Sequence, residues 1–196
     1  MTSRTDPRLQ LEPASRNVRI ALFLLVLVLP IVLVSASLLF VQTSNTQQHL
    51  IGGSFISTTA ITLGSVALLV LVVWWILDKS LRRHRVQVDA SGIEIATTFY
   101  TRKLSLDQLR LGQARVVSLD EHTELKPMFK TNATALPGFQ SGWFRLRNRN
   151  KALVARAGGN RVVWIPTDAG HDLLLQPKQP QILLDYLRSL ETPHRR

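Results

Sequence analysis

The residues best suited to acid–base or metal chemistry lie in one acidic segment, Asp120-Glu121-His122-Thr123-Glu124. An imidazole among three carboxylates can bind a divalent metal ion or exchange protons. The chain has five histidines, and none has a second histidine at metal-ligand spacing. A solvated acidic loop is therefore the favoured interpretation, and we expect no metal site here.

Other catalytic patterns are weak or absent from the sequence. His171-Asp172, at the start of an apolar run, resembles an oriented base, but no G-x-S-x-G nucleophile motif accompanies it. The phosphate-binding and dinucleotide-binding glycine motifs are missing. The chain has no cysteine, which excludes disulfides, cysteine nucleophiles and cysteine-ligated metals. We therefore expect a protein that is not an enzyme, with no catalytic residue and no cofactor.

Basic residues form the most informative group in the second half of the chain. In the segment 143–151 every second residue from Arg145 is basic, giving Arg145, Arg147, Arg149 and Lys151. If a strand covers 143–147, Trp143, Arg145 and Arg147 share one face, and the intervening residues point into a core. The structural interpretation is that these basic residues simply form the solvated outer face of a sheet. The functional one is a surface for anionic lipid headgroups or an acidic partner.

A second basic cluster follows an apolar run and comprises Lys79, Arg82, Arg83 and Arg85. The chain has 24 Lys and Arg against 13 Asp and Glu, a net charge of +11, which on its own suggests nucleic-acid binding. Basic residues beside an apolar run instead set membrane orientation, and they also attract anionic lipid. We therefore expect no nucleic acid among the partners.

Two long apolar stretches precede the rest of the chain, and neither 20–41 nor 50–77 contains a charged residue. Residues 20–41 and 50–78 are each long enough to cross a hydrocarbon core, which needs about 20 apolar residues. Pro30, near the middle of the first stretch, predicts a kink. The first stretch exceeds the 7–15 apolar residues of a cleaved signal peptide. The sequence thus predicts a hairpin of two transmembrane helices joined by a short external loop, 42–49.

The charges flanking these stretches predict the orientation of the hairpin. Basic residues precede the first stretch and follow the second, while residues 42–49 contain no charge. The positive-inside rule then places both ends in the cytoplasm: the N-terminal tail 1–19, the basic linker 79–85 and the C-terminal tail 191–196. We expect a multi-pass protein of a bacterial inner membrane.

Residues 86–190 are expected to form the only water-soluble core, as a mainly β domain. Alternating or β-branched runs predict about seven antiparallel strands, at 85–89, 93–100 with its continuation 102–106, 114–119, 143–147, 152–157, 161–165 and 171–176. Residues 120–142, with two prolines and two glycines, are expected to be an irregular loop, and Gly158-Gly159-Asn160 a hairpin turn. Residues 181–190 have the apolar spacing of an amphipathic helix that caps a partly open barrel.

This order of parts resembles the bacterial pleckstrin-homology-like (PH-like) domains, which are often attached to membrane spans. The resemblance rests on the stretches 136–144, 151–154, 162–167 and 173–177, which supply turns and core positions. It implies a non-catalytic, membrane-anchored binding or scaffolding module that recruits a protein partner or associates with itself. Phosphoinositide binding is not implied. The alternative is an accessory subunit or regulator of a membrane enzyme or transporter, with a site under loop 120–142.

Overall fold

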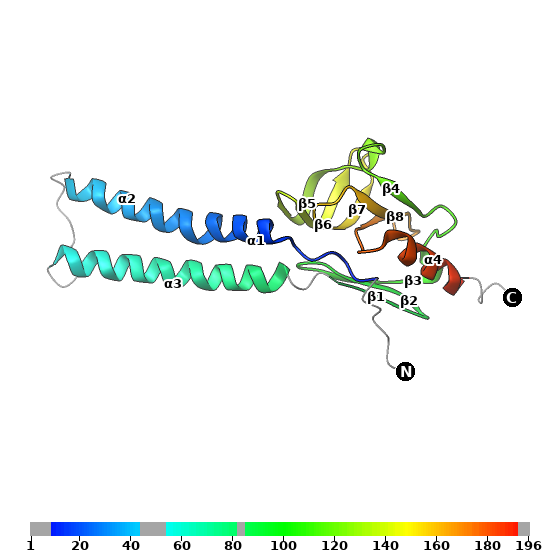
Figure 1. Cartoon of the computed structure of the whole chain (residues 1–196), viewed down its shortest axis with the longest axis horizontal. Coiled ribbons are helices and arrows are strands. Elements are labelled where there is room, and N and C mark those ends of the chain that lie inside the picture. Colours follow the sequence, from blue (N-terminus) through cyan, green and yellow to red (C-terminus); the bar gives the residue numbers. More distant parts are fainter. Residues whose placement is uncertain (1–8, 44–53, 82–84, 192–196) are drawn as a thin grey trace. The chain divides into compact units, whose positions relative to one another are not determined.

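The computed structural model describes residues 9–43, 54–81 and 85–191. It divides into two compact units, and each is described by itself. Residues 16–79 form a helical unit, and residues 80–191 together with the segment before residue 16 form a β-rich unit (Figure 1).

The helical unit contains two helices long and apolar enough to cross a membrane, over Arg16–Ser37 and Ile56–Ser80. The first is built from α1 (Arg16–Phe23), the π-helical turn η1 (Leu24–Val28) and α2 (Leu29–Thr43), and the second is α3 (Phe55–Leu81). The expected pair of apolar helices is thus confirmed. Most of the predicted loop 42–49 lies outside the described residues.

The first helix changes its hydrogen-bond pattern just before Pro30. The amide of Leu29 donates to the carbonyl of Leu24, which is the wider π spacing. Proline has no amide hydrogen, and its ring pushes away the carbonyl four residues earlier, here that of Val26 inside the π turn. A local π turn therefore accommodates Pro30 within a continuous helix.

Two contacts join the helices at the end where α1 begins. The Nε of Arg19 donates to Oδ1 of Asp78 at 2.8 Å, and Asp78 is buried. The ring of Phe23 meets that of Trp74 edge-on, with centroids 5.7 Å apart. A polar and an aromatic contact thus link the two long apolar helices at this end.

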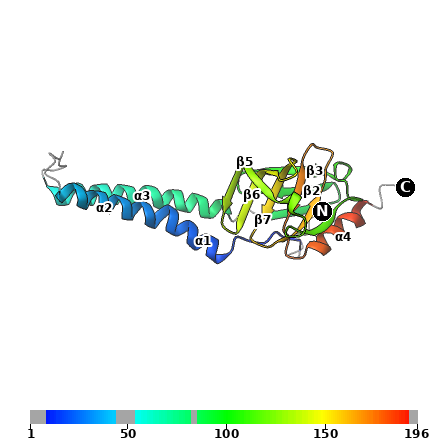
Figure 2. The ribbon, with the colours of Figure 1, turned by 90° about the horizontal axis from the view of Figure 1, so that it is seen from above.

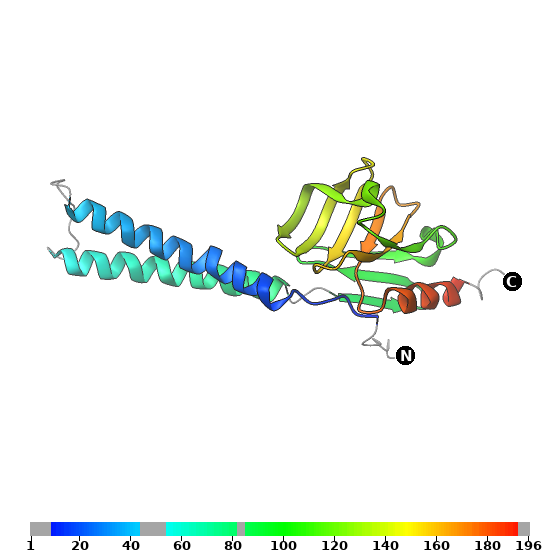
Figure 3. The same ribbon diagram turned by 45° about the horizontal axis from the view of Figure 1, so that its top comes forward.

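The β-rich unit has two sheets (Figure 3). The smaller is an antiparallel sheet of β1 (Arg85–Asp89), β2 (Gly92–Ala96) and β3 (Thr101–Ser105). The larger has the order β4-β8-β9-β7-β6-β5, with β4 (Arg115–Ser118), β5 (Pro127–Leu136), β6 (Phe139–Leu146), β7 (Lys151–Arg156), β8 (Arg161–Ile165) and β9 (Asp172–Leu175). Short 3-10 turns lie at η3 (Leu106–Gln108) and η4 (Thr123–Leu125), and α4 spans Pro180–Glu191.

The strand prediction was wrong in number and direction, since the described residues contain nine strands, of which β7 and β9 are parallel. The turn at 158–160 connects β7 to β8, but the two strands are not neighbours because β9 lies between them. Leu173, Leu174 and Leu175 are all fully buried. A strand that is apolar on both faces is stable only in the middle of a sheet whose two faces are both covered. This explains why β9 lies between β8 and β7.

The segment 120–142 is not the irregular loop that its prolines and glycines suggested. Apart from η4 it forms a hairpin, in which β5 pairs with β6 and the turn lies at Pro137-Gly138. Pro127 is the first residue of β5, a position that proline tolerates, and Gly138 has a φ of 76°. Two register shifts in β5, before Phe129 and before Asn132, break the alternation that would have revealed the strand.

Two apolar clusters flank the larger sheet. One lies between the two sheets and includes Trp143, Leu153 and Ile165, and α4 closes it with Leu183 and Leu187. The other lies on the opposite face of the larger sheet and includes Phe144 and Leu174. The expected C-terminal amphipathic helix is confirmed, and it covers the core between the sheets.

The N-terminal segment belongs to this core, contrary to the expectation that 86–190 would be its only source. Leu9 and Leu11 are buried in the cluster between the sheets. The amide of Glu12 donates to the carbonyl of Gln176 at 3.0 Å, and the Gln176 amide group donates to the Glu12 carboxylate at 2.7 Å. We call residues 9–12 the strap. Part of the predicted tail 1–19 is therefore a structural element of the β-rich unit.

Candidate functional site

Strand β6 carries the central side chain of the site, Trp143. Both faces of β6 are covered here: Phe144 faces one cluster, and Trp143, only 7% exposed, faces the other. The outer sheet face expected at Trp143 is therefore not solvated. Instead the ring contributes to a cavity of about 410 Å³ lined by Tyr100, Thr131, Asn132, Trp143, Arg145 and Lys151. We call it the Trp143 cavity.

Three adjacent strands place one row of side chains next to Trp143. Phe129 of β5 pairs with Arg145 of β6, and Arg145 pairs with Lys151 of β7. Directly paired residues of antiparallel strands lie on the same face of the sheet. Figure 2 shows β5, β6 and β7 side by side. The row therefore places an aromatic ring and two cations next to one another.

Two cations lie over the Trp143 ring. The Nζ of Lys151 is 4.4 Å from the ring centroid, and the Cζ of Arg102, from β3 in the smaller sheet, is 5.6 Å away. The negative face of the indole attracts each cation, by about 0.5–1 kcal/mol where the pair is exposed. The ring thus holds two positive side chains that would otherwise repel each other.

His171 completes the surroundings of Trp143. Its ring meets the indole edge-on at 4.8 Å, and its Nδ1 donates to the carbonyl of Ala169 at 3.0 Å. Its Nε2 is buried and has no hydrogen-bond partner among the described residues. Burial lowers the pKa of His171, and the charges of Arg102 and Lys151 lower it further. His171 is therefore held neutral beside the cations.

The cations of this site lack compensating carboxylates. Within the described part of the chain, Arg102, Arg145 and Lys151 form no ion pair, whereas Lys103 pairs with Glu94 and Arg110 with Asp168. The nearby Asp172 is buried and accepts hydrogen bonds from Trp164 Nε1 at 3.2 Å and Asn150 Nδ2 at 3.3 Å. The Trp143 cavity therefore has an uncompensated positive charge.

The structure separates the four basic residues predicted to share a surface. Arg145 and Lys151 line the cavity, while Arg147 and Arg149 lie in the exposed turn that joins β6 to β7. Arg149 adopts the left-handed conformation, with φ 72°. The alternation of basic residues in the sequence thus continues past the end of β6. Of the four residues, only Arg145 and Lys151 are cross-strand neighbours.

The second predicted cluster is described only at its ends. Lys79, in α3, lies with its Nζ 5.0 Å from the ring centroid of Trp75, and Arg85 is the first residue of β1. Arg82 and Arg83 lie outside the described residues.

Tyr100 lines the cavity and Arg102 lies over the Trp143 ring, and neither residue was predicted from the sequence. Arg102 lies in β3 of the smaller sheet, and Tyr100 directly precedes β3, more than forty residues before Trp143 in the chain. Only the packing of the two sheets brings them to Trp143. Nothing in the local pattern of 100–102 distinguishes these side chains from ordinary strand residues.

The acidic segment forms no comparable site. His122 Nδ1 lies 3.2 Å from Glu124 Oε1, and Glu121 and Glu124 are exposed. Among the described residues, no group of three or more acidic, histidine or cysteine side chains is arranged to hold a metal ion. The hairpin β5–β6 replaces the irregular loop 120–142 under which the alternative function placed a site.

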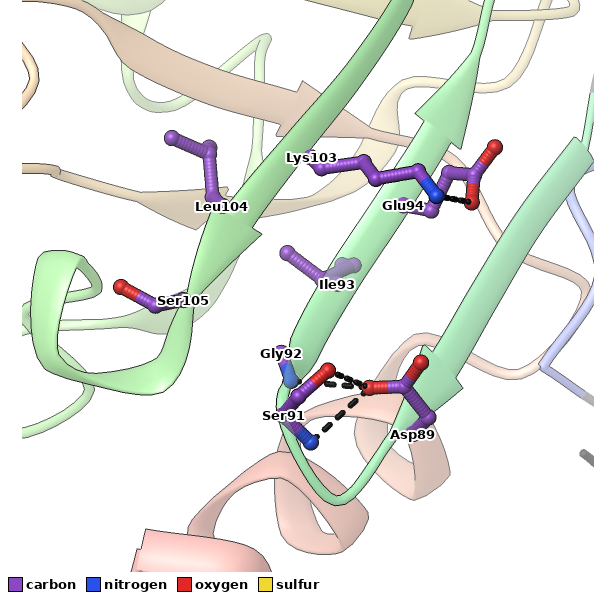
Figure 4. A pocket seen from close by; sticks show the side chains of 8 residues that line it. All are labelled: Asp89, Ser91, Gly92, Ile93, Glu94, Lys103, Leu104 and Ser105. Atoms are coloured by element: carbon purple, nitrogen blue, oxygen red, sulfur yellow. Dashed lines mark hydrogen bonds and ion pairs between the residues drawn. The ribbon is translucent and has the colours of Figure 1, made fainter. Parts of the chain in front are cut away.

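A further hollow lies at the β1–β2 turn, and its polar groups are already bonded to one another (Figure 4). Asp89 accepts hydrogen bonds from the amide and hydroxyl of Ser91, which lower the pKa of Asp89, and Lys103 pairs with Glu94 at 3.1 Å. A side chain at Gly92 would collide with the carbonyl of Leu104. The hollow is thus a structural turn.

Comparison of the chain with protein-family models, curated proteins and solved structures finds no match.

Proposed function

We propose that this protein is a non-catalytic, membrane-anchored module whose PH-like β domain recruits a protein partner, or a second copy, at the cytoplasmic face of a bacterial inner membrane. Two apolar helices anchor it, and the β-rich unit binds the partner through its uncompensated cations. PH-like architecture is proposed from the order of strands and C-terminal helix.

The strap is the observation that carries this proposal. Leu11 is buried in the same core as Leu183, although the two long apolar helices lie between them in the chain. A bilayer cannot pass through one folded core. If both helices span, both ends of the hairpin must therefore lie on one side, and the positive-inside rule selects the cytoplasm.

Because the chain has no cysteine, single cysteines can report its topology cleanly. We would introduce Ser3→Cys, Gln47→Cys or His194→Cys and label intact cells with a membrane-impermeant maleimide. We expect labelling of the Gln47 variant alone, with the other two labelled only after lysis. Labelling of the Ser3 or His194 variant in intact cells contradicts the topology.

Partner recruitment is tested by site-specific photocrosslinking in native membranes. A photoreactive amino acid replaces exposed Phe129 in one variant and exposed Ile182, on α4, in a matched control. We expect a discrete adduct from position 129 that is absent at position 182. An adduct of twice the chain's mass indicates self-association, a larger or smaller one a different protein. The absence of any protein adduct at position 129 contradicts recruitment through this surface.

A further inference from the structure

The Trp143 cavity offers hydrogen-bond donors without acceptors to match. Arg145 and Lys151 contribute charged donors, and neither the Tyr100 hydroxyl nor the Asn132 amide group has a hydrogen-bond partner among the described residues. No carboxylate lines the cavity. An occupant that supplies oxygen acceptors and negative charge would satisfy all of these groups.

The indole holds two of the cations in place before any ligand arrives. Lys151 and Arg102 lie over the Trp143 ring, and Arg145 is paired with Lys151 across β6 and β7. Side chains that are already positioned lose less conformational entropy on binding, so a single acidic group gains more from them than from free surface lysines.

An exposed aromatic side chain is the neighbour of one cation of the cavity. Phe129, the cross-strand neighbour of Arg145, is 65% exposed. An exposed apolar side chain beside a charged pocket favours a ligand that joins an acidic group to an apolar one. A free inorganic anion has no such apolar part, whereas a peptide carries both on neighbouring residues.

We infer that the Trp143 cavity binds an acidic segment of a protein partner. One Asp or Glu side chain is bound by Arg145, Lys151 and Arg102, and an adjacent apolar side chain packs on Phe129. The cavity, at about 410 Å³, has the volume of a site for one or two side chains. This inference rests on the proposed function, because it specifies what the recruited partner presents.

The test uses the full chain in phosphatidylcholine nanodiscs and a fluorescein-labelled peptide of alternating Glu and Leu. Binding is followed by fluorescence anisotropy. We expect Lys151→Glu and Arg145→Glu each to weaken binding by at least about tenfold, as is typical when one partner of a close charge pair is reversed. Arg149→Glu, the matched control, makes the same charge change in the exposed turn outside the cavity, and we expect less than about a twofold change.

A second peptide separates loss of the site from loss of folding. With Lys in place of Glu, it should bind the Lys151→Glu variant more tightly than the unaltered chain. Equal weakening by all three variants overturns the inference, since general charge then explains binding. Displacement of the peptide by equimolar inorganic phosphate also overturns the inference. The same holds if the peptide does not bind but the protein associates with phosphatidylglycerol vesicles. Cysteine labelling on the wrong side or absent crosslinks would instead contradict the proposed function.

Discussion

Two tryptophans of the β-rich unit, Trp143 and Trp164, differ in how the charge beside them is balanced. Arg115 lies 5.2 Å from the ring centroid of Trp164, and the indole N–H of Trp164 donates to the buried carboxylate of Asp172. Trp143 has two cations over its ring and no carboxylate. The same residue types thus form a contact with a carboxylate at one ring and leave two cations without a carboxylate at the other.

Replacing each ring by alanine should affect stability most. Trp143→Ala removes a buried ring from the core between the sheets, at a cost of about 3–5 kcal/mol. Trp164→Ala should cost less, because Trp164 is only partly buried. Urea unfolding of the full chain in detergent micelles, followed by far-ultraviolet circular dichroism, compares the two. A larger loss at Trp164 contradicts the comparison.

The carboxylate at Trp164 is the next largest contribution. Asp172→Ala leaves the Trp164 N–H and the Asn150 amide group without their acceptor, which should cost about 1–3 kcal/mol in the same unfolding experiment. Asp172→Asn retains an acceptor oxygen and should lose less. As a control, Asp168→Ala removes an exposed ion pair with Arg110, worth at most about 1 kcal/mol.

The pH dependence of stability should arise on the Trp143 side. The folded-state pKa of His171 is lowered, chiefly by burial. The unfolded state therefore binds the proton more readily, and stability falls as the pH drops below the unfolded pKa of about 6.5. The loss ends below the folded pKa. Denaturation midpoints at successive pH values should show this fall, and His171→Gln should reduce it. If the stability of the His171→Gln chain and that of the unaltered chain fall equally with pH, this assignment is contradicted. His122→Gln serves as the control.

The smallest expected effect concerns the cations themselves. Arg115→Met removes a cation–π contact worth about 0.5–1 kcal/mol from Trp164. Lys151→Met removes a similar contact from Trp143 but also relieves repulsion from Arg102 and Arg145, so it should cost less. A greater loss for Lys151→Met than for Arg115→Met in urea unfolding would show that the cations at Trp143 are compensated after all.

The parts predicted well from the sequence are those with a long regular signal. The two apolar helices and α4 follow from uncharged length and from helical spacing over ten residues or more. Strand β5 was missed because two register shifts disrupt its alternation. The strap was missed because Leu9 and Leu11 lie in a short polar segment with no extended pattern.

The candidate site was predicted only in part, for a related reason. Arg145 and Lys151 were recognisable because they are close in sequence and alternate along neighbouring strands. Arg102 reaches the same ring from the other sheet, and the order of strands that allows this is not visible in local spacing. Arg147 and Arg149 were included because alternation alone does not mark where β6 ends.

The strap also has a consequence for biosynthesis. Glu12 and Gln176 bond across 164 positions, so the strap can reach its place only after nearly the whole chain has been translated. Contacts this distant in sequence form late and slowly, because the loop between them must close first. In a chain whose first helix inserted in the opposite orientation, Leu9 and Leu11 could not reach their positions in the core between the sheets. If the two helices span a membrane, completion of the domain therefore depends on correct insertion of the hairpin.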